Sequence, residues 1–173
     1  MIHIIKKYGI RSIWHFTDQV NLKSIIEYGG LYSLNELEKR KINVQAPGGN
    51  GLSHILDKGY GLDEYIHLSF LPKHPMLHHA QKDKRILRPF WIRINPAVML
   101  KEGVLFCPEV ANKSNSYLYD RSEVEKVIDF EVLFTFMDWS NPIIRRRRKA
   151  ALKSEILIPK YISIDQIINI PNG

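Results

Sequence analysis

Cysteine is almost absent from this sequence. Cys107 is the single cysteine among 173 residues, which excludes an internal disulfide, and no Cys/His cluster has the spacing of zinc ligands. Apolar runs are short as well, and none approaches the ~20 residues that a membrane-spanning helix needs. Residues 1–8 are charged and lack the apolar stretch of a secretory signal. We therefore expect a protein of the reducing cytoplasm, with no metal ion and no membrane contact.

Acidic residues are outnumbered by basic ones. The chain has 25 Lys and Arg against 18 Asp and Glu, a net charge of +7. A basic surface attracts polyanions through phosphate contacts and counterion release, although many basic proteins bind no nucleic acid. The length suits one domain with its own core, and no repeat, low-complexity tract or linker divides it. We expect a single domain over residues 1–173.

The secondary-structure pattern predicts several short strands and few helices. Residues 12–16 read as a strand that leads into a helix capped by Thr17 or Asp18, and Gly29-Gly30 ends that helix near residue 28. A flexible break is expected at 47–51. Further helices are predicted at 34–41, 52–58 and 142–152, and further strands at 65–70, 90–94, 104–106, 130–136 and 155–159. This mixture indicates an α+β domain built around antiparallel sheets.

The segment 65–70 alternates cleanly between apolar and polar residues. Ile66, Leu68 and Phe70 share one face and are expected in the core. The opposite face carries Tyr65, His67 and Ser69. The pattern predicts a half-buried strand whose polar face holds functional side chains.

Three further features carry candidate chemistry. His15 and Thr17 put an imidazole and a hydroxyl on one side of a strand end, where a surface loop with a helix cap is the plainer alternative. Glu155 opens an apolar strand, and a carboxylate facing a cleft there acts as an acid, a base or a stabiliser of positive charge. Its alternative is an exposed strand-end glutamate. The arginines at 145–148 point around a whole helix, so some would contact phosphates and others would be solvated or paired with acids.

Two other patterns predict no site. His74 and His78 are four residues apart, as metal ligands on a helix would be, but Pro75 between them argues against a regular helix and no acidic ligand is near. The glycine-rich segment 48–51 lacks the Lys and Ser/Thr of a phosphate-binding loop.

The candidate residues occur in an order that resembles the DarT family. His15-Phe16-Thr17, residues 21–25 and Gly29-Gly30-Leu31 resemble its amino-terminal signature. Residues 65–76 resemble its central strand and the segment after it, and residues 150–159 resemble its catalytic strand. The likeness spans nearly the whole chain and implies an ADP-ribosyltransferase fold, a split antiparallel sheet core with peripheral helices and NAD in the cleft.

The resemblance also implies an activity. Members of this family are toxins that use NAD to ADP-ribosylate bases of single-stranded DNA, often thymidine, and are paired with a macrodomain antitoxin that removes the modification. The chain would thus be an NAD-dependent mono-ADP-ribosyltransferase, a transferase of the glycosyltransferase or nucleotidyltransferase kind, with NAD as co-substrate.

Matched residue by residue, the resemblance assigns roles. Glu155 matches the catalytic glutamate, and Phe16 would offer backbone groups to the nicotinamide amide. The other NAD-contact positions are His15, Thr17, Ser24 and Ser33, and the strand bordering the nicotinamide carries Tyr65, His67 and Ser69. The family's catalytic arginine has no counterpart in residues 50–56, where His54 stands nearest; Arg40 is the closest arginine on the amino-terminal side. Many relatives carry Pro and Tyr where this chain has His67 and Ser69, which leaves the target base and polymer open.

The expected mechanism sets the role of Glu155. Breaking the glycosidic bond of NAD leaves an oxocarbenium-like sugar, and a carboxylate near the ribose stabilises its charge. Single-stranded DNA is expected as the partner before RNA, with bases stacked on aromatic rings and basic residues along the backbone. The candidates are Tyr117, Tyr119, Arg121, Arg145 and Arg148.

Other functions stay open on the sequence. The same NAD cleft would serve an enzyme that modifies RNA or a protein side chain. A non-catalytic basic nucleic-acid-binding protein would leave activity in cells unchanged in a Glu155→Gln variant. A tRNA 2′-phosphotransferase has a related fold but needs several Arg and His residues around a 2′-phosphate, and the sequence shows no such set.

Overall fold

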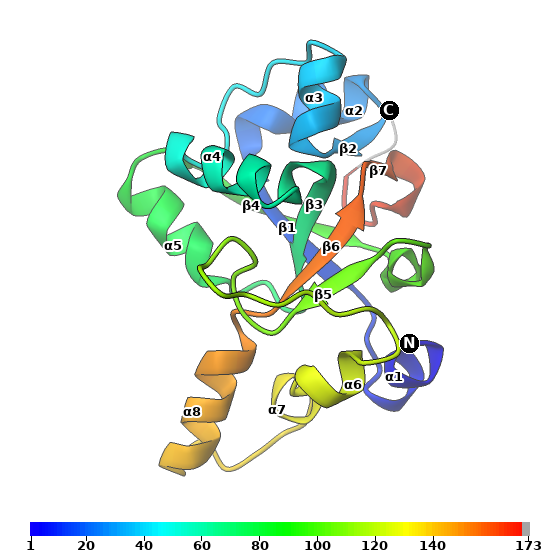
Figure 1. Cartoon of the computed structure of the whole chain (residues 1–173), viewed down its shortest axis with the longest axis vertical. Coiled ribbons are helices and arrows are strands. Elements are labelled where there is room, and N and C mark those ends of the chain that lie inside the picture. Colours follow the sequence, from blue (N-terminus) through cyan, green and yellow to red (C-terminus); the bar gives the residue numbers. More distant parts are fainter. Residues whose placement is uncertain (171–173) are drawn as a thin grey trace.

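The computed structural model describes residues 1–170, and an antiparallel sheet forms its centre (Figure 1). The strand order is β4-β1-β3-β6-β5, so β3 lies in the middle between β1 and β6. A second, two-stranded sheet pairs β2 with β7. The strands are β1 (Ile13–Asp18), β2 (Gly30–Tyr32), β3 (Tyr65–Ser69), β4 (Pro89–Ile94), β5 (Leu105–Cys107), β6 (Glu155–Pro159) and β7 (Tyr161–Ser163). The α+β architecture with antiparallel pairing is confirmed.

The helices gather at the two ends of the central sheet. Figure 1 shows α2, α3 and α4 with the small sheet at one end, and α1, α6, α7 and α8 at the other, with α5 beside the sheet. Their bounds are α1 (Ile2–Lys7), α2 (Leu22–Glu27), α3 (Leu34–Lys39), α4 (Gly51–Gly59), α5 (Pro75–Lys82), α6 (Val124–Val127), α7 (Phe130–Phe134) and α8 (Pro142–Ala151). Short 3₁₀ turns occupy η1 (Gln19–Asn21), η2 (Leu62–Glu64), η3 (Pro96–Leu100) and η4 (Ile164–Gln166). Over residues 1–170, no helix has the length and apolar character to cross a membrane.

Polar side chains set where several helices begin. Asp18 accepts a hydrogen bond from the Val20 amide at the start of η1, and Asn141 accepts one from the Ile143 amide at the start of α8. Both were expected as caps, because a side-chain oxygen satisfies an amide that has no partner inside the helix. The strand at 155–159 and the helix that precedes it are confirmed as well.

The helix at Pro75 corrects one expectation. Pro75 does not prevent a regular helix; it occupies the first turn of α5, where proline's missing N–H costs no hydrogen bond. His74 is the cap, its Nδ1 accepting from the Met76 amide at 3.4 Å, so it does not share a helix face with His78. No group of three or more His, Cys, Asp or Glu in the described part of the chain could hold a metal ion.

The strand predicted at 130–136 is wrong, because residues 130–134 form helix α7. A short apolar run does not distinguish a strand from a buried helix by its periodicity. The deciding group is Asp129, whose side chain accepts from the Val132 amide and starts the helix. Phe130 is buried there and meets the ring of Phe70 edge to face.

The core lies against the face of β3 that the alternation predicted. Ile66, Leu68 and Phe70 are all buried in the main hydrophobic cluster. On the other side of the same strand, Tyr65 and His67 remain partly accessible. Since successive residues of a strand point to opposite faces, burying the apolar set turns His67 toward the cavity described next.

Candidate active site

A cavity of about 450 Å³ lies where the central sheet meets the helices of one end. β1, β3 and the first residue of β6 form its floor, and α2, α3, α4 and the loop at 42–49 form its walls. Its volume is in the range of ordinary ligand sites, about 300–1,000 Å³. Glu155 lines it and is only 5% exposed.

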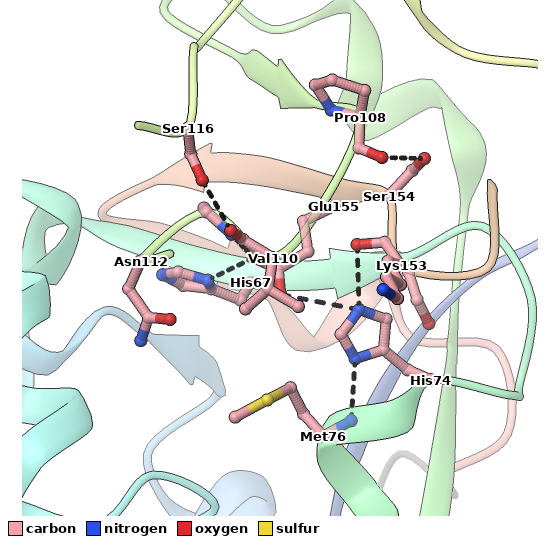
Figure 2. A network of polar contacts seen from close by, with 12 residues as sticks. His67, His74, Met76, Pro108, Val110, Asn112, Ser116, Lys153, Ser154 and Glu155 are labelled. Carbon is pink, nitrogen blue, oxygen red and sulfur yellow. Dashed lines mark hydrogen bonds and ion pairs between the residues drawn. The ribbon is translucent and has the colours of Figure 1, made fainter. Parts of the chain in front are cut away.

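Glu155 is held by three groups from three different elements (Figure 2). One carboxylate oxygen, Oε2, accepts from Nδ1 of His67 at 2.9 Å and from the amide of Ala111 at 3.2 Å. The other, Oε1, lies 3.5 Å from Nε2 of His74. The sheet makes these contacts possible, because Glu155 pairs with Ser69 on β3 two positions from His67. The exposed strand-end alternative is therefore excluded for Glu155.

Electrostatics keep Glu155 ionised. Burial by itself raises its pKa, but the hydrogen bond and charge of His67, together with His74 and the Ala111 amide, lower the pKa below its ordinary value. Burial likewise lowers the pKa of His67, yet the hydrogen bond and charge of Glu155 and the charge of Asp57 outweigh it and raise the pKa. Each partner of the pair therefore favours the charged form of the other.

Two other histidines are neutral members of the same site. His15 donates from Nδ1 to the carbonyl oxygen of His67 at 2.9 Å, and burial lowers the pKa of His15. His74 donates from Nε2 to the carbonyl of Lys153 at 3.3 Å while its Nδ1 accepts from the Met76 amide. Burial lowers the pKa of His74 as well. Each hydrogen bond fixes the tautomer of its ring.

Asn21 ties the cavity loop to β1, a role that the sequence did not reveal. Its Nδ2 donates to Oγ1 of Thr17 at 3.0 Å and to the carbonyl of Ala46 at 2.8 Å. Its Oδ1 accepts from the Ala46 amide at 3.1 Å. Asn21 is buried, so these bonds are made away from water. No pattern in the sequence around Asn21 indicates that its side chain bonds to a residue 25 positions away.

Gly48 and Gly49, at the end of this loop, allow close packing against two aromatic rings. A Cβ at Gly49 would lie 2.7 Å from the ring of His54, and one at Gly48 would lie 3.2 Å from the ring of Phe16. Glycine therefore lets the backbone pass between these two rings.

The structure brings most of the sequence-predicted site residues to this cavity. Its lining includes His15, Phe16, Thr17, Ser24, His54, Tyr65, His67, Ser69 and Glu155. Ser33 stands apart from the lining, since its buried hydroxyl accepts from the Glu36 amide and caps α3. Ser69 donates its hydroxyl to the carbonyl of Leu71 at 2.8 Å.

The residues predicted to contact nucleic acid lie outside the cavity. Tyr117 is 71% exposed, whereas Tyr119 is half-buried and bridges to Phe106 through its backbone. Arg121 donates to the carbonyl of Leu100. Arg145 is exposed on α8. Arg148 donates to the carbonyls of Val132 and Leu133 and lies over the ring of Trp139.

One known family matches nearly the whole sequence. A family model described as ssDNA thymidine ADP-ribosyltransferase, DarT, matches residues 14–171. No curated protein matches the sequence.

Solved structures share the fold at low sequence identity. Thermosipho africanus DarTG in complex with ADP-ribose is 22% identical with a TM-score of 0.65, over 91% of this chain and 42% of that one. Thermus sp. 2.9 DarT in complex with ADP-ribosylated ssDNA is 20% identical with a TM-score of 0.65, over 92% and 79%. The same Thermus protein in complex with NAD+ is 19% identical with a TM-score of 0.58, over 91% and 79%. The chain thus spans less than half of the Thermosipho protein and about four-fifths of the Thermus protein.

Proposed function

This chain belongs to the DarT family of ssDNA thymidine ADP-ribosyltransferases, and we propose on that basis that it transfers ADP-ribose from NAD to a base of single-stranded DNA. One observation carries the proposal: Glu155 is a buried, ionised carboxylate on the floor of a ligand-sized cavity. Relatives of the same fold were solved with NAD+ and with ADP-ribosylated ssDNA.

The cavity residues suit NAD as the co-substrate. NAD supplies an activated sugar whose bond to nicotinamide breaks during transfer, while the target base attacks the sugar carbon and gives up its proton. His67 Nε2 is buried and has no hydrogen-bond partner among residues 1–170, so it is ready for a ligand. Gly48 and Gly49 let the backbone pack closely against the rings of Phe16 and His54, which places both rings in the lining.

Glu155 supplies the electrostatic part of the reaction. Positive charge grows on the ribose as nicotinamide leaves, and a fixed carboxylate stabilises that charge more in the transition state than in the ground state. His67 and the Ala111 amide hold Oε2, so the carboxylate does not have to reorient during the reaction. The neutral His15 and the Thr17 hydroxyl position the co-substrate on the neighbouring strand. His54, on the opposite wall, is the proposed stand-in for the family's arginine.

An unpaired base is the acceptor that this geometry favours. A base has to leave its stack to reach a carboxylate at the bottom of a cavity, and an unpaired base does so at the lowest cost. Thymidine is the target that the family description names. Outside the cavity, the exposed ring of Tyr117 and the exposed guanidinium of Arg145 are proposed to guide the strand, with Tyr119, Arg121 and Arg148 in supporting positions.

The biological setting is proposed from the family as well. The Thermosipho relative carries the name DarTG, and a toxin with a macrodomain antitoxin in the cytoplasm fits an enzyme that damages DNA. We further propose that residues 1–173 form one ADP-ribosyltransferase domain.

The test is the intact mass of oligonucleotides after incubation with the protein and NAD. Pools of single-stranded DNA and of RNA are compared, with Glu155→Gln as the control. A gain of one ADP-ribose on DNA that the variant lacks supports the proposal. A gain on RNA alone moves the function to the RNA-modifying alternative. No gain with intact NAD leaves a nucleic-acid-binding or protein-modifying role.

A further inference from the structure

The cavity has an unusual charge inventory. Among the described residues that line it there is no lysine and no arginine. Its carboxylates are Glu38, Asp57, Asp63 and Glu155, and its histidines are His15, His54, His67 and His74. The pyrophosphate of NAD or of ADP-ribose brings two more negative charges into this space. Among the described lining residues, only a protonated histidine can therefore offer a positive charge to the pyrophosphate.

The hydrogen bonds single out one of the four rings. His15 and His74 are neutral, because desolvation lowers the pKa of each ring and each uses a ring nitrogen in a bond to the backbone. His54 makes no ion pair with any carboxylate in residues 1–170. His67 differs from all three, because its Nδ1 donates to a carboxylate, Glu155, at 2.9 Å.

The second nitrogen of His67 is the informative atom. Nε2 is buried and makes no hydrogen bond to any described residue, although the Leu62 backbone beside it favours the protonated ring and helps to raise the pKa of His67. A buried N–H without a partner is unfavourable, so a ligand that supplies a partner would be bound more tightly. The residue lines the cavity, which makes a bound ligand the available partner.

We infer that His67 is a positioning residue that does two things as an imidazolium: its Nδ1–H fixes Glu155, and its Nε2–H donates to an anionic oxygen of the ADP-ribose part of NAD. The identity of the ligand rests on the proposed function. His67 then supplies, from β3, the cationic contact that no lysine or arginine in the lining provides.

Four titratable groups face His67 and set how it responds to pH. Glu155 on β6 and Asp57 on α4 favour the imidazolium, while His74 before α5 and His15 on β1 are neutral neighbours. With a raised pKa, His67 is charged below its ordinary value of 6.5 and loses the proton only as the pH rises through the raised value. Affinity for an anionic ligand therefore falls toward alkaline pH, whereas affinity for uncharged nicotinamide does not.

The experiment is calorimetric binding of ADP-ribose and, separately, of nicotinamide between about pH 6 and pH 9. We expect the affinity of the wild type for ADP-ribose to fall about tenfold over this range, the scale of one charged hydrogen bond. His67→Gln should bind ADP-ribose more weakly and without a pH trend, and His67→Arg should restore affinity without the trend. His78→Gln, which changes an exposed histidine on α5, should follow the wild type.

Two outcomes overturn this inference without rejecting the proposed function. One is ADP-ribose binding that does not change with pH in the wild type, and the other is a pH trend that persists in His67→Gln. Nitrogen NMR of the His67 ring provides a measurement that needs no variant. It should report both nitrogens protonated at about pH 6, below the ordinary pKa of 6.5, and a neutral ring there would also overturn the inference. A wild type with a charged His67 that neither binds NAD or ADP-ribose nor modifies DNA would instead reject the proposed function.

Discussion

The cavity lining and the opposite end of the sheet carry different kinds of charge. The cavity end is lined by carboxylates and histidines, without lysine or arginine among its described lining residues. The end with α7 and α8, at the bottom of Figure 1, carries four consecutive arginines and three exposed apolar side chains, Phe136 at 88%, Ile143 at 66% and Trp139 at 36%. The net charge of +7 therefore describes the outer surface of the protein and says little about the charge inside the cavity.

Within the arginine run itself, the four side chains divide their tasks. Arg147 forms ion pairs with Asp129 and Glu131, which raise the pKa of its guanidinium, and Arg148 donates to the last carbonyls of α7. Arg145 and Arg146 remain exposed. Consecutive residues on a helix face different directions, so the pairing seen at Arg147 agrees with the expectation that part of the run would meet acidic side chains. The exposed pair is the part that is open to a phosphate backbone.

Glu155→Gln should have the largest effect. It should change catalysis at the cavity end and leave DNA binding at the arginine end unchanged. Glutamine keeps the size and an acceptor oxygen but loses the charge that stabilises the ribose. We expect the rate of ADP-ribose transfer to fall by ~10²–10⁴, measured by oligonucleotide mass under single-turnover conditions. Affinity for DNA, measured by fluorescence anisotropy, should stay within about twofold, because the arginine end is untouched. An equal fall in DNA affinity would mean that the two ends act as one site.

Asn21→Ala should have the next largest effect, again confined to the cavity end. The variant leaves the Thr17 hydroxyl, the Ala46 amide and the Ala46 carbonyl without their shared partner. A loss of about 1–3 kcal/mol in the free energy of unfolding is expected, together with a higher KM for NAD because the loop is no longer held to β1. Urea unfolding and NAD kinetics check it. Asn35→Ala, which changes another asparagine of the same end, serves as the control. An identical rise in the KM for NAD in that variant would mean that the contacts of Asn21 with the loop do not explain the effect.

How much of this site follows from the sequence depends on the distance between partners. The alternation of residues 65–70 predicted which face His67 occupies, and the caps at Asp18 and Asn141 predicted helix starts, because each signal lies within a few residues of its consequence. The partnership of His67 with Glu155 spans 88 positions, and that of Asn21 with Ala46 spans 25. Such contacts are decided by strand register and loop packing, which no local pattern encodes.

Two predicted elements differ from the structure for a local reason. Residues 130–134 form a helix in place of the strand predicted at 130–136, because the cap at Asp129 decides an ambiguous apolar run. Pro75 begins α5 and does not break it, because proline is unfavourable inside a helix and acceptable in its first turn. In both cases the residues at the start of the helix decide a secondary structure that the rest of the segment leaves ambiguous.

Removing Arg145 and Arg146 together should affect only the basic end. If both exposed guanidinium groups contact the backbone of single-stranded DNA, the double alanine variant should bind about tenfold more weakly at low salt. The slope of log affinity against log salt should fall by roughly 1 to 1.5. Replacing Lys6 and Arg11, two exposed cations near the amino terminus, removes the same charge as a control. An equal change in that control would mean that net charge, and not the position of the arginines, attracts the DNA.

The smallest effect expected is a pH-dependent difference in stability at the cavity end. The raised pKa of His67 contributes stability that is complete below its ordinary value of 6.5 and is lost as the pH rises through the folded value. The lowered pKa of Glu155 contributes stability that is present above 4.5 and is lost as the pH falls through its folded value. The pair therefore stabilises the fold most between these two values.

Scanning calorimetry of the wild type and His67→Gln tests this directly. The difference in Tm should be greatest between about pH 5 and pH 6.5 and should shrink by a few degrees toward pH 9. His78→Gln, at an exposed position of α5, should show no trend of this kind. A difference that grows with pH would mean that His67 is neutral in the folded protein. The cavity lining would then lack the imidazolium of His67, and its contrast with the arginine end would be greater.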